Sequence, residues 1–393
     1  MFELEKAYEM IIDNCELLPI LQIPIDKAVG YVCAEDLISK LDMPPFDKSA
    51  VDGYAFKWNE NLTEYKNRGI IPAGNSTLDS VKEGECISIM TGAPLPEGTD
   101  TVIMIENTDK NTNSIIFNKI PKKFSNVCYK GEDIKQNTLI FSKGKKIKSS
   151  DIALLTASGY SKVMVSKKPY ISILNTGSEI IEPGKKLKFG QIYNTNGIML
   201  RSMTEDIGIN AKYIGIASDV KSDLRRKISE GLKSDILLIS GGVSMGEFDL
   251  VPKVLISLGV KQVFHKVAIK PGKPVFFGKT DSCLVFGLPG NPLSNFVGFE
   301  LFVKTAVRIM TGERDVFPHS ELGIITGSFK HRGDRINFFP AIIENITGKM
   351  SITPVKSNGS ADVFSLSKAN GFLVADIDRK EYAPGDTIEY ITF

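Results

Sequence analysis

The residues DILLISGG at 235–242 join a short apolar run to two consecutive glycines. The run shows no alternation of polar and apolar residues, which is typical of a strand buried on both faces of a parallel sheet. Gly241 and Gly242 predict a strand-to-helix turn in which the backbone can approach a ligand and its N–H groups can face an anion. A tight turn that binds nothing is an equally good interpretation of these two glycines alone.

Residues 169–317 repeat this alternation of strand and helix. Apolar runs at 170–174 and 212–216 predict strands, and 197–207, 223–232, 250–258 and 293–310 predict helices. The alternation indicates crossover connections and a doubly wound α/β domain. Ligands of such sheets bind beyond the carboxyl ends of the strands. We therefore expect a site where the polar clusters NTGSE at 175–179, SD at 218–219 and SGGVS at 240–244 fall.

The rest of the chain predicts three further structural units. Residues 44–127 hold short β-like runs between Gly and Pro turns, which indicates a small β-rich domain. Residues 1–14 have helical apolar spacing. We expect this helix to pack with 128–168, so that 1–43 and 128–168 form one discontinuous domain. Residues 318–393 consist of strand-like runs and turns, which predicts a C-terminal β-barrel or sandwich.

Composition excludes several classes of protein. The 393 residues suffice for two to four domains, and the net charge of +2, without a clustered basic run, argues against nucleic-acid binding. The five cysteines are far apart and form no CxxC pair, so neither a disulfide framework nor a zinc site is predicted. No apolar run approaches the length of a membrane span and no signal peptide is recognisable. We expect a cytoplasmic protein that does not bind membranes.

The stretch AIKPGKP at 268–274 holds Lys270 and Lys273 in a loop stiffened by prolines. A preformed pair of ammonium groups binds an oxyanion with little loss of loop entropy. Lysine, a point charge with three donors, suits phosphate or another tetrahedral oxyanion. A solvated surface turn is the alternative, and it is the commoner one for a KPGK segment taken alone.

Three acidic residues are expected near the same crevice. Glu179 and Asp219 follow the ends of neighbouring strands, and Asp249 follows the Gly-Gly turn. Carboxylates that share a site with phosphate indicate Mg²⁺, which favours one or two carboxylates plus phosphate oxygens. Exposed acids that cap helices are the alternative interpretation. None of the three histidines falls in these loops, so we assign acid–base chemistry to carboxylates.

Several motifs, in this order, closely resemble the molybdopterin molybdenumtransferase (MoeA) family, which includes the E domain of gephyrin. The motifs are PPFDKSAVDGYA (44–55), MTGAPLPEGTDTVI (90–103), GEDI (131–134), NTGSEI (175–180), GQIYNTN (190–196), SGGVSMGEFD (240–249), AIKPGKP (268–274) and GLPGNP (287–292). The resemblance covers essentially the whole chain. It implies an elongated four-domain subunit that forms a homodimer, with a cleft between the α/β domain of one subunit and the β-rich domain of the other.

The resemblance also implies a reaction. Adenylated molybdopterin and molybdate bind, Mg²⁺ assists hydrolysis of the pyrophosphate-type bond, AMP leaves, and molybdenum enters the dithiolene. The implied partners are small-molecule substrates, with a molybdopterin adenylyltransferase and molybdoenzyme apoproteins as further candidates. Tungstate fits the same expectations as molybdate, since both anions are tetrahedral.

Site residues follow from the resemblance, position by position. Asp249 is the magnesium ligand and, with Glu179 and Asp219, an active-site acid, while Asp52 and Thr91 would come from the partner subunit. The expected molybdate-binding residues are Lys270, Lys273, Ser360 and Arg335. The expected pterin and nucleotide contacts are Thr176, Gly177, Gly241, Gly242, Ser244, Pro289 and Pro292. Cys128 and Pro340 depart from the family pattern, because we expect arginine at both positions.

Two other functions stay open. A molybdopterin adenylyltransferase has a single α/β domain with a similar Ser-Gly-Gly turn, and this alternative accounts for residues 169–312 only. A scaffold, as the gephyrin relative suggests, would use the barrel to bind a partner peptide. The N-terminal loops and the barrel favour molybdenum insertion over adenylation.

Overall fold

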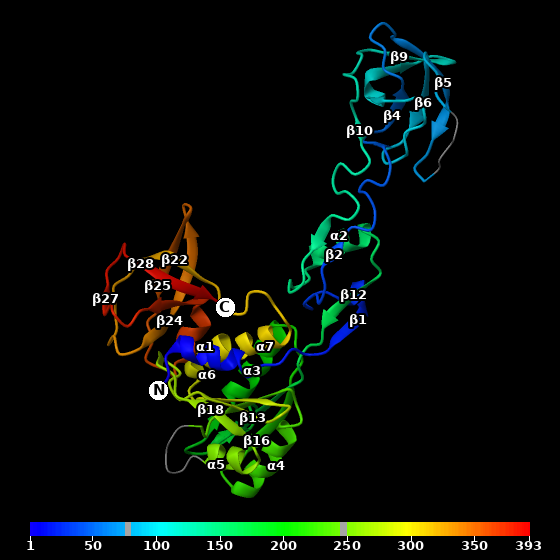
Figure 1. The fold of residues 1–393 in the computed structure, drawn as a ribbon. Coiled ribbons are helices and arrows are strands. Elements are labelled where there is room, and N and C mark those ends of the chain that lie inside the picture. The colour runs from blue at the N-terminus through cyan, green and yellow to red at the C-terminus, as the bar shows by residue number, and fades with distance from the viewer. Residues whose placement is uncertain (75–79, 244–249) are drawn as a thin grey trace.

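The computed structural model describes residues 1–74, 80–243 and 250–393. The molecule is elongated (Figure 1). We call residues 1–12 and 169–393 the body and residues 20–166 the arm. The body contains the α/β domain and the C-terminal barrel, and the arm leads away from it to a β-rich unit at its far end.

The body is built on a six-stranded sheet. Its order is β16 (Lys212–Ala217), β13 (Ile171–Thr176), β17 (Ile236–Ser240), β21 (Leu284–Leu288), β20 (Phe276–Lys279) and β18 (Lys261–His265). The first four strands are parallel, as predicted. β20 runs antiparallel to both neighbours. The reason is the short turn between β20 and β21, in which Thr280 N donates to Cys283 O. A turn this short can join only antiparallel strands, because parallel strands need a longer crossover connection.

Helices cover both faces of this sheet. Leu237 and Ile239 of β17 face one core with α4 (Lys221–Gly231) and α5 (Leu250–Ser257). Ile236 and Leu238 face the other core, with α3 (Thr195–Asp206), α6 (Pro292–Gly298) and α7 (Lys304–Met310). The alternation along β17 follows from the two-residue period of a strand. The helix predicted at 293–310 is helical throughout but includes a π-helical segment, Phe299–Val303.

The N-terminal helix α1 (Leu4–Ile12) does not lie where we expected it. Leu4, Ala7 and Ile11 are buried in the core of the α/β domain, and α1 contacts α7 and β18 instead of residues 128–168. Backbone hydrogen bonds from Phe2 N to Lys266 O (3.0 Å) and from Ala268 N to Phe2 O (2.7 Å) hold the chain beside the KPGK loop. Helical spacing predicts that this segment has an apolar stripe, but it does not determine which apolar surface of the protein covers that stripe.

The arm contains two units along its length. Near the body, β1 (Ile20–Pro24) pairs with β12 (Lys162–Ser166), β2 (Leu37–Ile38) pairs with β11 (Leu139–Phe141), and α2 (Ser149–Ala157) packs with them around one core. At the far end, a sheet has the order β7 (Thr101–Met104), β4 (Gly53–Phe56), β6 (Glu85–Ile89), β5 (Glu64–Ile71), β9 (Ser114–Phe117) and β8 (Thr108–Lys110). The short strands β3 (Lys48–Ser49) and β10 (Val127–Cys128) pair with each other. The boundaries of the four domains stay a prediction.

The C-terminal strands close into a barrel, as expected. Their order is β24 (Ile336–Ile346), β25 (Lys349–Pro354), β22 (Ser320–Ile325), β28 (Thr387–Thr392) and β26 (Gly371–Ala375), and β26 pairs again with β24. A short strand of the body, β19 (Ile269–Lys270), adds to β24. Smaller elements are β14 (Ile180–Ile181), β15 (Ile192–Tyr193), β23 (Phe329–Lys330), β27 (Glu381–Tyr382) and α8 (Val363–Lys368). The barrel is therefore attached to the KPGK loop.

Candidate functional site

A cleft of about 570 Å³ lies between the KPGK loop and the barrel. All four side chains expected to bind molybdate line it, together with one predicted pterin contact. These five residues are Lys270, Lys273, Arg335, Ser360 and Pro289. They come from segments far apart in the sequence, so the tertiary structure brings them together in one cavity.

The backbone of the KPGK loop is held from two sides. Ile269 and Lys270 pair with Ile336 and Asn337 of the barrel strand β24. Val267 N donates to Lys273 O (3.0 Å), which closes the loop. Gly272 is buried with φ +108°, and a Cβ there would lie 3.1 Å from Ile269 Cδ1. A left-handed backbone in so little space requires glycine.

The charge of this cleft is uniformly positive among the residues that the structure describes. Its lining contains Lys270, Lys273, Lys330 and Arg335 but no aspartate or glutamate. Arg335 is partly neutralised from outside, because its Nε donates to Asp334 Oδ2 at 3.1 Å. Desolvation acts to raise the pKa of Asp334, but the positive charges of Arg335 and Lys270 contribute to a net lowering. Such a cleft favours an anionic ligand. Lys330 was not among the residues expected from the sequence to bind the anion.

The Ser-Gly-Gly turn lies next to the end of β13, as predicted. Gly241 and Gly242 have φ values of +89° and +63°. A Cβ on Gly241 would lie 2.7 Å from Thr176 O, and one on Gly242 would lie 2.8 Å from Thr176 Oγ1. Both glycines are thus required by close packing as well as by backbone conformation. Thr176, Gly241 and Gly242, three of the expected pterin and nucleotide contacts, are neighbours.

Two asparagines that no sequence pattern singled out connect this turn to the cleft. Asn196 Nδ2 and Asn295 Nδ2 each donate to Ser240 Oγ at 2.9 Å. Asn196 also donates to Gly290 O (2.8 Å), and Asn295 donates to Pro289 O (3.1 Å). The loop at 289–292 is therefore tied to the glycine turn. Both asparagines lie in or beside quoted motifs, GQIYNTN and GLPGNP, and this proximity is the only signal the sequence offers.

The loop at 289–292 also reaches the barrel. Asn291 Nδ2 donates to Ser360 Oγ (2.8 Å), and Leu293 N donates to Ser360 O (3.0 Å). Pro292 begins α6 at a position where its missing N–H costs nothing. Ser360 is thus positioned by the same loop that contacts the glycine turn, so the cleft and the turn form one continuous region.

Buried polar atoms without partners lie at the end of β13 and on the helices α3 and α6 in this region. Both side-chain atoms of Asn175, Thr176 Oγ1, Asn196 Oδ1 and Asn295 Oδ1 lack a hydrogen-bond partner among the residues that the structure describes. A buried polar atom is destabilising unless something satisfies it. A ligand with several donors and acceptors, such as a pterin or a nucleotide, would satisfy these atoms.

The acidic residues lie in two loops that touch. Ser178 N donates to Asp219 Oδ2 (2.9 Å), and Asp219 N donates to Ser178 Oγ (3.2 Å). The Glu179 carboxylate turns back over Gly177, where a Cβ would lie 2.8 Å from its oxygens. Glu179 and Asp219 are exposed. Asp249 and Ser244 lie outside the described residues, and within the described part of the chain no group of three His, Cys, Asp or Glu side chains is arranged to hold a metal.

Asp223 holds the second of these loops. Its Oδ2 accepts hydrogen bonds from Ser218 N (3.0 Å) and Ser218 Oγ (3.2 Å). The backbone bond from Ser218 is the main reason why the pKa of Asp223 is lowered to about 2, and Arg226 and Lys227 add to it while desolvation opposes. Asp223 therefore positions the segment that carries Asp219.

Asp223→Asn is expected to lower the free energy of unfolding at pH 7 by about 1–2 kcal/mol. Because the folded-state pKa lies below the unfolded value of about 3.9, the contribution of the charge is present above that value. It is lost as the pH falls toward 2. Urea unfolding between pH 7 and pH 3 measures the difference. Asp281→Asn, in an exposed turn, is the control, and a difference that does not shrink with falling pH would contradict the prediction.

Asp52 and Thr91 lie together, but far from the cleft. Asp52 Oδ1 accepts hydrogen bonds from Thr91 N (2.7 Å) and Thr91 Oγ1 (2.9 Å), and these bonds lower the Asp52 pKa. Both residues are at the ends of strands in the far unit of the arm, next to β4 and β6 (Figure 1). Within one chain the structure does not bring them to the body.

Matches to known proteins extend over nearly the whole chain. The MoeA N-terminal region (domain I and II) matches residues 2–159, a probable molybdopterin binding domain matches 172–308, and the MoeA C-terminal region (domain IV) matches 323–393. A molybdopterin molybdenumtransferase of Staphylococcus aureus is 32% identical over 98% of this chain and 94% of its own length. The chain belongs to the MoeA family.

Other MoeA relatives agree with this assignment. A molybdopterin molybdenumtransferase of Staphylococcus epidermidis is 31% identical over 94% of this chain and 90% of its own length. The crystal structure of a molybdopterin biosynthesis MoeA protein from Pyrococcus horikoshii OT3 superposes with a TM-score of 0.84, at 30% identity and covering 100% of each chain. The order of the units along this chain is therefore that of MoeA proteins. No described helix has the length and apolar character needed to cross a membrane.

Proposed function

We propose that this MoeA-family chain inserts molybdenum from molybdate into adenylated molybdopterin and releases AMP. The observation that carries the proposal is the continuity of two sites. A cleft whose described lining contains lysine and arginine but no carboxylate is joined, through Asn196, Asn295 and the loop at 289–292, to the glycine turn. One region can therefore hold an oxyanion beside a nucleotide or pterin.

The residues of the cleft have distinct roles in this proposal. Lys270 and Lys273 hold molybdate by charge-assisted hydrogen bonds, and Arg335 and Ser360 complete the contact from the barrel side. The glycine turn with Thr176 and Gly177 binds the phosphate and pterin side, where glycines without a Cβ let a ligand approach the backbone closely. Pro289 and Pro292 shape the wall between the two. Orientation of the anion beside the dithiolene lowers the barrier by proximity.

Magnesium fits the acidic side of the region. Glu179 and Asp219 offer exposed carboxylate oxygens, the ligands that Mg²⁺ prefers, on two loops in contact. With Asp249, which lies outside the described residues, they would hold the ion. Bound Mg²⁺ would neutralise charge on the phosphate. We assign one of these carboxylates to orient the attacking water, since a carboxylate accepts the water proton.

A second subunit completes the site in our proposal. Asp52 and Thr91 are displayed together at the far end of the arm, where within this chain they meet no part of the cleft. In a homodimer the arm of one subunit can reach the body of the other. In this arrangement the Asp52–Thr91 pair enters the active site of the other subunit, whereas in a monomer it would lie far from any active site.

The direct test is molybdate-dependent release of AMP. The purified chain, incubated with adenylated molybdopterin, Mg²⁺ and molybdate, is expected to release AMP, and Asp249→Ala is expected to abolish release while leaving the melting temperature unchanged. Absence of AMP from the unmodified protein would sink the proposal. Formation of adenylated molybdopterin from molybdopterin and ATP would favour the adenylyltransferase alternative. Full activity of Asp249→Ala would favour a binding role. The matches to residues 2–159 and 323–393 favour insertion.

A further inference from the structure

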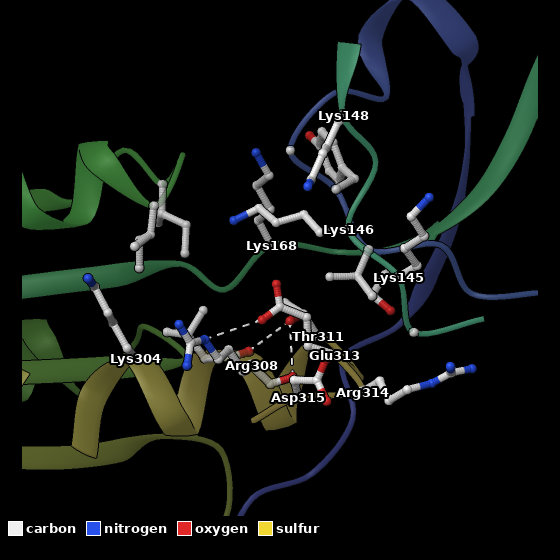
Figure 2. A pocket seen from close by; sticks show the side chains of 18 of the residues that line it. Lys145, Lys146, Lys148, Lys168, Lys304, Arg308, Thr311, Glu313, Arg314 and Asp315 are labelled. Atoms are coloured by element: carbon white, nitrogen blue, oxygen red, sulfur yellow. Dashed lines mark hydrogen bonds and ion pairs between the residues drawn. The ribbon is translucent and has the colours of Figure 1, made fainter. Parts of the chain in front are cut away.

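A second cavity, of about 540 Å³, lies where the arm meets the body (Figure 2). One wall comes from the arm and its junction, with Tyr31, the segment 142–148 and Lys168. The other comes from the body, with Ile207, Ile209, α7 and the segment 311–319. Next to it, Arg314 N donates to Gly144 O (3.0 Å), a backbone contact between body and arm. The cavity shares no lining residue with the cleft at the KPGK loop.

The lining of this cavity carries a surplus of positive charge. Its basic side chains are Lys145, Lys146, Lys148, Lys168, Lys304, Arg308 and Arg314, and its acidic side chains are Glu313 and Asp315. Figure 2 shows Lys146, Lys148 and Lys168 across the cavity from Lys304 and Arg308 on α7, whereas Arg314 points away. Five cationic groups from both sides thus surround one space.

Acidic residues neutralise only part of this charge. Lys304 pairs with Glu300 (2.7 Å), Arg308 with Glu313 (3.4 Å), and Lys145 with Asp151 (3.1 Å). By contrast, Lys146, Lys148 and Lys168 form no ion pair with any residue that the structure describes. The surplus therefore comes from the arm side of the cavity.

Lys168 has the most unusual surroundings of the three. Its Nζ donates to Gly208 O (2.9 Å) and lies 4.3 Å from the centre of the Tyr31 ring, over its face. Burial lowers the pKa of Lys168, and the charge of Lys146 lowers it further. Two ammonium groups that repel each other in a partly buried space are stabilised by an anion between them.

We propose that this cavity binds a multiply charged oxyanion of the phosphate or pyrophosphate type and thereby fixes the arm against the body. The volume lies within the usual range for small-molecule sites. Lysine and arginine donors on opposite walls suit an anion with oxygens on all sides. An anion that contacts Lys146 and Lys168 on one side and Arg308 on the other links the arm to the body. This inference does not depend on the proposed function.

Calorimetric titration with pyrophosphate tests the site in the full chain at low salt. The variant Lys270→Gln/Lys273→Gln removes the oxyanion-binding lysines of the main cleft, and the part of the remaining pyrophosphate binding that depends on Lys146 and Lys148 reports the second cavity. Adding Lys146→Gln/Lys148→Gln is expected to weaken this binding by about tenfold or more. The matched control, Lys143→Gln/Lys162→Gln, removes exposed arm lysines that do not line the cavity, and it is expected to leave the affinity unchanged. ADP in place of pyrophosphate, compared with and without Lys146→Gln/Lys148→Gln, distinguishes a nucleotide diphosphate from the free anion as the ligand of this cavity.

Further measurements separate binding from folding. The conservative variant Lys146→Arg/Lys148→Arg is expected to retain binding, and pyrophosphate is expected to slow hydrogen exchange in segments 142–148 and 311–319 together, because it contacts both walls. Absence of pyrophosphate and ADP binding in the Lys270→Gln/Lys273→Gln background would overturn the proposal. The proposal would also be overturned if pyrophosphate bound with the same affinity before and after Lys146→Gln/Lys148→Gln is added. Protection of only one wall would refute the link between arm and body.

Discussion

Lys270→Ala/Lys273→Ala is expected to raise the molybdate concentration for half-maximal AMP release by about 100-fold or more, while AMP affinity changes by no more than about twofold. Each charge-assisted hydrogen bond contributes about 1.5–3 kcal/mol, so loss of two corresponds to at least that factor. The nucleotide contacts are expected on another segment, at the glycine turn. AMP release at varied molybdate and calorimetric titration with AMP measure the two quantities separately.

The matched control for this experiment is Lys253→Ala/Lys261→Ala. These two lysines are exposed on the same α/β domain and do not line the cleft, so the change in net charge is the same without loss of the proposed contacts. If molybdate use and AMP affinity fall equally in Lys270→Ala/Lys273→Ala, the lysines do not divide the site as proposed. If Lys253→Ala/Lys261→Ala weakens molybdate use as much, the loss comes from the change in net charge and not from the proposed contacts.

A mixed dimer is expected to regain activity from two inactive variants. Asp52→Ala removes the acceptor of two hydrogen bonds at the far end of the arm, and Lys270→Ala/Lys273→Ala removes the cations of the body. If each active site takes the arm of one subunit and the body of the other, a heterodimer has one site with both defects and one site with neither. Purified heterodimer should then show about half of the unmodified activity.

Co-expression of the two variants with different affinity tags yields the heterodimer for this test. Each parental homodimer, purified in the same way, gives the baseline, and AMP release is the readout. A heterodimer no more active than its parents would contradict a site shared between subunits. Activity of Asp52→Ala alone close to the unmodified level would show that the far end of the arm does not take part in the reaction.

The features that the sequence predicted well are local ones. The buried strand Ile236–Ser240, the glycine turn after it and the helix Thr195–Asp206 each follow from the period of apolar residues or the backbone freedom of glycine. The barrel was also predicted, because short strands and turns dominate the C-terminal segment. The roles of Asp249 and Ser244 stay predictions, as both lie outside the described residues.

The candidate site was only partly predictable. The lysines of the KPGK loop stand out because prolines and a glycine surround them, and their common cleft with Arg335 and Ser360 is seen in the structure. Asn196 and Asn295 were missed, since an isolated asparagine has no local pattern that distinguishes a buried network from a surface turn. Their shared acceptor, Ser240, is 44 residues from one and 55 from the other.

The sequence by itself determined which segments form strands, helices and glycine turns, since these depend on neighbours within a few positions of the chain. Only the tertiary structure decided which segments meet. It placed α1 on the α/β domain and not on residues 128–168, and it set β19 against the barrel. It also gathered the lysines of 142–148 and Lys168 opposite α7. Packing of complementary apolar surfaces selects these long-range contacts, and no short stretch of sequence encodes both surfaces at once.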